Sequence, residues 1–170
     1  MKLFFISRRH LKIGAAVVAL TLISAIYTAG FQRGPISAFM NNERMIPIYC
    51  VDTEEKKVAI SFDAAWGSDK TEDLLKILKE YNVKTTFFLV AFWVDKYPDM
   101  VKRISEEGHE IGNHSASHPQ MSQLSEEKIT EELTSTSEKI EAITGSKVNL
   151  FRPPFGDYNN RLMRVSKDLG

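Results

Sequence analysis

The stretch Gly112-Asn113-His114-Ser115-Ala116-Ser117-His118-Pro119 carries two imidazoles four residues apart, directly after a short run that is typical of a strand. Neutral imidazole is the commonest protein ligand for divalent transition metals. A catalytic zinc site usually takes three protein ligands and leaves one position open for water. The pair would therefore supply most of a metal site. The flanking glycine and proline fit equally well a surface turn on which two histidines are ordinary polar residues.

Strands and helices are predicted to alternate on both sides of this stretch. Apolar and β-branched runs predict strands over residues 58–63, 84–90, 109–113 and 148–151. Helical patterns are expected in between, namely one capped by Ser68 or Asp69, one from Pro98 to about Gly108, one from Ser125 to Gly145 and one over residues 159–169. This order predicts an α/β fold with a parallel sheet and helices outside it.

Polar side chains follow three of the predicted strands. Asp63 ends the first strand, the pair His114 and His118 follows the third, and Arg152 follows the fourth. In parallel α/β folds, functional residues gather at the carboxyl ends of the strands. We therefore expect these side chains to meet at one end of the sheet, although they are far apart in the chain.

The overall composition narrows the class of protein. The 170 residues carry 22 basic and 22 acidic side chains, and this balance argues against a nucleic-acid partner. Cys50 is the single cysteine, which excludes an intrachain disulfide and a zinc ribbon built from cysteines. The length suggests one folded domain, and the sequence leaves the oligomeric state open.

The N-terminal part is predicted to anchor the chain in the cell membrane. Residues 1–12 form a basic flank, and the apolar run 13–31 is close to the length that spans a bilayer. An uncleaved, single-pass signal-anchor is one interpretation, and a cleaved signal peptide, which would give a secreted protein, is the other. Both place the remainder, a linker over residues 32–55 and a domain over residues 56–170, outside the cytoplasm.

Three motifs together resemble the polysaccharide deacetylase (NodB-homology) family. They are Ser61-Phe62-Asp63, the stretch from His114 to His118, and Arg152-Pro153-Pro154-Phe155-Gly156, in the order in which that family has them. The resemblance covers residues 57–170. Phe62-Asp63-Ala64-Ala65-Trp66-Gly67, after a membrane-anchored N-terminus, is most similar to the branch found in spore-forming bacteria.

The resemblance implies a distorted (β/α) barrel that hydrolyses the N-acetyl groups of a polysaccharide such as peptidoglycan or a chitin-like glycan. It implies a divalent metal, zinc foremost and cobalt or manganese as alternatives, bound by His114 and His118. Asp63 matches the catalytic base, and Arg152 matches the residue that pairs with it. The backbone N–H of Phe155 matches the donor that stabilises the oxyanion.

Each of these residues also has a plainer interpretation. Asp63 would otherwise be a solvated or helix-capping carboxylate, and Arg152 a partner in a surface salt bridge. Trp66, Pro154 and Tyr158 are expected to line the substrate groove. Trp66 and Trp93 would either stack on sugar rings or be buried in the core.

Two features depart from the family pattern. Ala64 stands where the family has a second aspartate, which is the third metal ligand. Three outcomes are open: Asp63 itself completes the coordination, water or substrate takes the third position, or the metal binds poorly. The chain is also expected to be incomplete at its C-terminus, because four β/α units do not close a barrel. Three interpretations follow: a deacetylase with a weakly held metal, a catalytically weak or inactive glycan-binding protein on the same fold, and a structural membrane-anchored partner.

Overall fold

The computed structural model describes residues 8–33 and 43–170, which separate into two units at Arg44/Met45. The first unit contains helix α1, Arg8–Arg33. In the part of the chain that the structure describes, no helix has both the length and the apolar character needed to cross a membrane. The span predicted over residues 13–31 is therefore a helix that is not shown to be a membrane helix. Residues 1–7 of the predicted flank and 34–42 of the predicted linker lie outside the described residues.

The second unit is built on a parallel sheet, as predicted. Strands β1 (Ser61–Ala64), β2 (Thr86–Leu89) and β3 (Glu110–Asn113) pair in the order β1-β2-β3. The register places Asp63 opposite Phe88, and Phe88 opposite Gly112. The first strand starts later than predicted, because Val58 is 89% exposed and residues 55–60 have no regular structure.

The fourth predicted strand, residues 148–151, is reduced to one parallel bridge between Asn113 and Phe151. The Asn113 N–H donates to the carbonyl of Leu150, and the Arg152 N–H donates to the carbonyl of Asn113. The ladder does not extend backward, because the Val148 N–H donates to the Glu141 carboxylate instead. Among the described residues the sheet is thus open and does not close into a barrel, as the sequence predicted.

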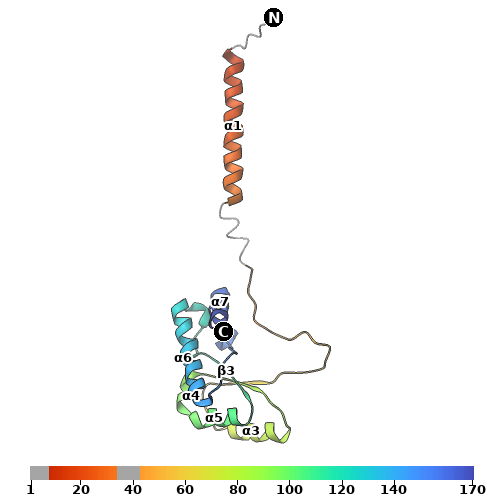
Figure 1. Ribbon diagram of the computed structural model, residues 1–170, viewed down its shortest axis with the longest axis vertical. Coiled ribbons are helices and arrows are strands. Elements are labelled where there is room, and N and C mark those ends of the chain that lie inside the picture. The colour runs from red at the N-terminus through yellow and green to blue at the C-terminus, as the bar shows by residue number, and fades with distance from the viewer. Residues whose placement is uncertain (1–7, 34–42) are drawn as a thin grey trace. The chain divides into compact units, whose positions relative to one another are not determined.

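Helices follow each strand (Figure 1). Their bounds are α3 Thr71–Glu80, α4 Ala91–Lys96, α5 Pro98–Glu106, α6 Glu126–Thr144 and α7 Asn160–Leu169, with short 3-10 turns η1 Met121–Gln123 and η2 Pro154–Gly156. Ser125 caps α6 by accepting from the Lys128 N–H, and Gly145 ends it with φ 70°. The predicted caps Ser68 and Asp69 are wrong, because Lys70 is the N-cap and no side chain accepts a bond there.

The core of the second unit lies between β2 and the helices. Phe87 and Leu89 of β2 are buried together with apolar side chains of α3, α4, α5 and α6. A second cluster joins α6 to α7 through Ile129, Leu133 and Leu162. Helix α6 belongs to both clusters, so it is fixed against the sheet and against the last helix (Figure 1).

Candidate active site

An ion pair links the end of β1 to the loop that follows the bridge at residue 151. Arg152 Nη1 donates to Asp63 Oδ1 at 2.7 Å, and Nη2 donates to the Ser61 hydroxyl at 2.6 Å. The guanidinium also lies over the ring of Phe88, 4.2 Å from its centroid. Three contacts with neighbouring strands β1 and β2 therefore fix the orientation of Arg152, and Arg152 in turn fixes the Asp63 carboxylate.

His114 completes the cluster from the end of β3. Its ring is buried, and Nδ1 lies 2.7 Å from the carbonyl oxygen of Arg152. A carbonyl only accepts, so Nδ1 carries the proton, and Nε2 keeps its lone pair. Nε2 lies 3.9 Å from Asp63 Oδ2. Burial lowers the pKa of His114, and this outweighs the opposing effects of the Arg152 carbonyl and the Asp63 charge. A neutral imidazole with a free lone pair therefore faces the carboxylate.

His118 lies on the open side of this cluster, among aromatic rings. Its ring centroid is 5.0 Å from that of His114 and 4.7 Å from that of Phe155. Trp66 is 77% exposed, and its ring centroid lies 6.3 Å from that of His118. The structure therefore brings the two imidazoles together and places an exposed tryptophan beside them.

Three residues at or beside the imidazole pair have strained backbone conformations. Ser115, His118 and Phe155 have φ values of 70°, 58° and 59°, in the left-handed region that side chains other than glycine rarely adopt. Such conformations cost free energy and persist only where surrounding contacts impose them, which makes them frequent at functional sites. The strain at these three residues is independent support for a functional site.

The remaining predicted site residues differ in burial and in the contacts that they make. Pro154 is buried and precedes Phe155, whose N–H donates to no acceptor in the part of the chain that the structure describes. Trp93 is fully buried, and its indole N–H donates to the carbonyl of Gly67. Tyr158 packs against the cluster between α6 and α7, and its hydroxyl bonds to that of Tyr49. Of the two tryptophans, only Trp66 is exposed at the site.

A family model described as polysaccharide deacetylase matches residues 51–170. The chain belongs to the polysaccharide deacetylase family. The resemblance carried by the three motifs is thereby confirmed, and the parallel sheet is the one expected of this family.

Relatives and solved structures agree with the family assignment. The chain is 39% identical over 122 residues to the uncharacterized protein YlxY of Bacillus subtilis, covering 72% of this chain and 38% of YlxY. It is 36% identical over 129 residues to the peptidoglycan-N-acetylmuramic acid deacetylase PdaA of the same species, covering 75% of this chain and 49% of PdaA. It is also similar to a mutant of BA3943, a CE4 family pseudoenzyme of Bacillus anthracis, with a TM-score of 0.71, 38% identity, and coverage of 73% of this chain and 45% of that one. The chain thus spans half or less of each of these proteins.

The donor set of this member of the polysaccharide deacetylase family fits a metal ion only in part. His114 and His118 supply two imidazole ligands, and the methyl group of Ala64 at the end of β1 supplies none. Among the residues that the structure describes, no three His, Cys, Asp or Glu side chains are close enough together to hold an ion. The third ligand expected of a catalytic zinc site is therefore missing from the described side chains.

Several residues that hold the candidate active site together were not predicted to have this role from the sequence. Ser61 and Phe88 position Arg152, and Glu132 of α6 binds the loop between the two imidazoles. The alternation of strand residues gives a signal for Ser61 and Phe88, because Ser61 and Asp63 lie two apart on β1 and Phe88 is paired with Asp63. Nothing in the pattern of α6 distinguishes Glu132 from its solvent-facing glutamates.

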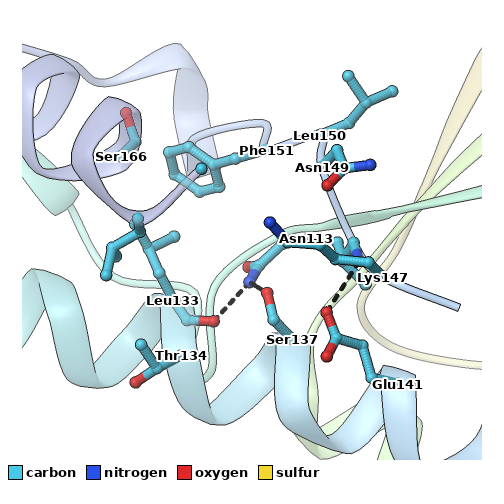
Figure 2. Close-up of a pocket in the computed structure, with 13 residues that line it drawn as sticks. Asn113, Leu133, Thr134, Ser137, Glu141, Lys147, Asn149, Leu150, Phe151 and Ser166 are labelled. Carbon is cyan, nitrogen blue, oxygen red and sulfur yellow. Dashed lines mark hydrogen bonds between the residues drawn. The ribbon is translucent and has the colours of Figure 1, made fainter.

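A pocket of about 130 Å³ lies elsewhere, between α6, α7 and residues 147–151. Figure 2 shows Asn113 at its wall, donating from its side-chain amide to the Leu133 carbonyl and the Ser137 hydroxyl. Asp63, the two imidazoles and Arg152 do not line this pocket. The strained backbone and the ion pair both lie at the end of the sheet, beside Asp63 and His114. We therefore locate the candidate active site there and not in the pocket.

Proposed function

We propose that this chain is the catalytic part of a hydrolase that removes N-acetyl groups from an extracytoplasmic polysaccharide, such as peptidoglycan or a chitin-like glycan. The observation that carries the proposal is the Asp63 carboxylate, fixed by Arg152 at 2.7 Å and facing His114 Nε2 at 3.9 Å. A fixed carboxylate beside a neutral imidazole, at the carboxyl ends of parallel strands, suits amide hydrolysis. The name of the relative PdaA supports peptidoglycan as the substrate class.

In this proposal Asp63 is the general base. It takes the proton of the attacking water, which must come within hydrogen-bond reach of the carboxylate. Oδ1 is bound to Arg152, so Oδ2, the oxygen that faces His114, is the one that accepts the proton. The Phe155 N–H, on a turn stiffened by Pro153 and Pro154, is the proposed donor to the developing oxyanion.

A divalent ion, zinc foremost, is proposed to be held weakly by His114 and His118. The ion would polarise the acetyl carbonyl and lower the pKa of a bound water. The chain's own contribution is to present the imidazole of His114 to the Asp63 carboxylate, with the imidazole of His118 beside it. With Ala64 in the third position, we expect lower affinity than that of a site with three protein ligands.

Acetate release tests the proposal. The purified protein is incubated with N-acetylglucosamine oligomers and with peptidoglycan, with and without added zinc or cobalt, and acetate is measured. We expect slow acetate release that depends on the ion. Ala64→Asp should accelerate acetate release and increase the affinity for the ion. Asp63→Asn is the matched control and should abolish release in both backgrounds. Absence of metal-dependent release from both the wild-type protein and the Ala64→Asp variant would refute the hydrolase.

The second candidate function is glycan binding without turnover on the same fold. Ala64 favours it, and so does the similarity to BA3943, which is named a pseudoenzyme. The two candidates differ in one result. A pure binding protein would retain N-acetylated oligomers on an affinity matrix while Asp63→Asn and wild type release equally little acetate.

We also propose, from the sequence pattern of residues 1–31, that the N-terminal segment carries the catalytic part to the outer side of the cell membrane, with a role in spore formation. The basic flank before an apolar run supports the orientation. Membrane fractionation followed by protease treatment of intact protoplasts tests the location. Recovery of a protected, soluble protein would contradict it.

A further inference from the structure

Helix α6 holds the loop between the two imidazoles through one carboxylate. Glu132 Oε2 accepts from the backbone N–H groups of Ala116 and Ser117, each at 2.8 Å. Glu132 Oε1 accepts from the Ser117 hydroxyl at 2.6 Å. A solvent-facing glutamate on a helix ordinarily forms one loose ion pair of little energetic value. Three hydrogen bonds from one short segment to one carboxylate indicate a specific structural task instead.

The neighbouring amides of the loop donate to the sheet or within the loop itself. The His114 N–H donates to the Leu89 carbonyl of β2, the Ser115 N–H donates to the Asn113 side chain, and the His118 N–H donates to the Ser115 hydroxyl. The two amides in the middle, Ala116 and Ser117, donate instead to a side chain of α6. Without Glu132 these two donors would face water or stay unpaired, and the middle of the loop would lose its hydrogen bonds to α6.

The strained backbone explains why the loop needs this tie. Ser115 and His118 both have left-handed φ values, and conformations of this kind relax unless outside contacts impose them. Glu132 acts between these two residues. The base of the loop is attached to the same helix, because Asn113 donates to the Leu133 carbonyl and the Ser137 hydroxyl (Figure 2). One rigid helix thus binds the loop at its start and at its middle.

We propose that Glu132 is a positioning residue, whose carboxylate fixes the His118 imidazole relative to His114 by holding the amides of Ala116 and Ser117. It acts through the loop and contacts neither imidazole in the hydrogen bonds described. The inference rests on the proposed function in one respect, namely that the two imidazoles bind an ion. The hydrogen bonds that hold the loop belong to the protein without any ion.

The test compares Glu132→Ala, Glu132→Gln and the matched control Glu138→Ala, an exposed glutamate on the same helix. The first measurement is amide hydrogen exchange by NMR on the metal-free protein, with the buried strand residue Leu89 as a reference for global opening. Glu132→Ala should accelerate exchange at Ala116 and Ser117 by about tenfold or more relative to Leu89, the loss expected for a charged acceptor. Glu132→Gln keeps a carbonyl acceptor and should fall between wild type and alanine, and Glu138→Ala should match wild type.

The second measurement is Co²⁺ affinity. Outer residues that orient metal ligands typically change affinity by about 10–100-fold, and we expect Glu132→Ala to weaken Co²⁺ binding by this factor. Equal acceleration at Leu89 in Glu132→Ala, or unchanged exchange at Ala116 and Ser117 in both variants, would overturn the inference. If Glu132→Ala did not fold, the intermediate exchange of Glu132→Gln would decide. A wild-type protein that bound no Co²⁺ would defeat the proposed ion site, whereas the exchange comparison would still decide the role of Glu132.

Discussion

Arg152 shows how much of the site depends on the shape of one side chain. Its two terminal nitrogens bind Asp63 and Ser61, and its plane lies over Phe88. A lysine would keep the charge, but its single ammonium group can neither form both bonds in this geometry nor stack on the ring. The structure therefore distinguishes the charge of Arg152 from its orientation.

We predict that Arg152→Lys lowers kcat/KM for deacetylation by about 10–100-fold, the value of one or two charge-assisted hydrogen bonds. The loss should appear mainly in kcat, because Asp63 is misaligned while the glycan still binds. Arg103→Lys is the control, since Arg103 pairs with Glu72 and Glu107 away from the site. An unchanged kcat in Arg152→Lys would show that Asp63 needs no fixed orientation.

The sequence predicted which distant polar side chains would meet, and their roles in catalysis and metal binding stay predictions. Asp63 lies near the end of β1, the histidine pair follows β3 and Arg152 follows the bridge at Phe151, and the structure brings Asp63, His114 and Arg152 into contact. Glu132 escaped prediction because α6 carries several glutamates, and only the three-dimensional path of the loop selects one of them.

At the scale of elements, close approach and capping explain most of the local order. Gly112 of β3 lies under Phe88, and a Cβ there would be 2.5 Å from Phe88 Cδ1 and 3.1 Å from the Leu150 carbonyl. Gly145 has open space around it, but its φ of 70° belongs to the left-handed end of α6. The two glycines are thus required for different reasons.

We predict that Gly112→Ala destabilises the fold by about 1–3 kcal/mol through crowding, and that it also displaces Phe88 and with it Arg152. Gly145→Ala should cost about 1–2 kcal/mol through its φ alone and leave the site intact. Urea unfolding measures the free energies, and acetate release reports on the site. A Gly112→Ala protein with full stability would contradict the close packing of β3 on β2.

The start of α6 gives a matched pair of serines. Ser125 accepts from the Lys128 N–H as the N-cap, whereas Ser135, inside the helix, bonds back to the Glu131 carbonyl. We predict that Ser125→Ala lowers the free energy of unfolding by about 1 kcal/mol, and that Ser135→Ala leaves it unchanged or raises it slightly. Thermal or urea unfolding of the two variants compares them directly, and equal effects would contradict the cap.

Elements with clear ends were predicted well, and those without were not. The cap at Ser125 and the glycine at 145 gave the correct limits of α6. Helix α4, Ala91–Lys96, was missed because its residues continue the apolar run of β2 and no side chain caps its start. Residues 148–151 have the composition of a strand, but Glu141 on α6 takes the amide of Val148, which no local pattern reveals.

For the molecule as a whole, two buried imidazoles make stability depend on pH. Burial lowers the pKa of His109, with the charge of Lys84 acting in the same direction and that of Glu107 opposing it. Burial likewise lowers the pKa of His114. Below about pH 6.5, the usual histidine pKa, the unfolded chain binds protons that the folded chain does not yet accept. Proton binding therefore stabilises the unfolded state relative to the folded state, and the free energy of unfolding decreases as the pH falls.

We predict that the free energy of unfolding is nearly constant at neutral pH and decreases as pH falls from about 6.5 through the lowered folded-state values. The Thr85 N–H donates to His109 Nδ1 at 3.3 Å, and His109→Asn keeps an acceptor for it. This variant should reduce the dependence of the unfolding free energy on pH. Urea titrations at several pH values measure that free energy. A stability that rises on acidification would contradict neutral, buried imidazoles.

The alternation of strands and helices predicted the parallel sheet and most of the helices of the second unit, because it is a property of many residues at once. The meeting of Asp63, His114 and Arg152 within a few ångströms was expected in outline only. Its distances depend on the register of β1, β2 and β3 and on the bridge at Phe151, which are set by packing between segments distant in the chain.

The ion pair between Asp63 and Arg152 joins positions 89 apart along the chain. During synthesis on the ribosome, β1 emerges long before its arginine partner, and the chain is made from the N-terminus at about 5–20 residues per second. For several seconds the nascent chain therefore has the Asp63 carboxylate without the guanidinium that orients it. The fixed orientation of this carboxylate arises only after the segment around residue 152 has been made and has docked against β1.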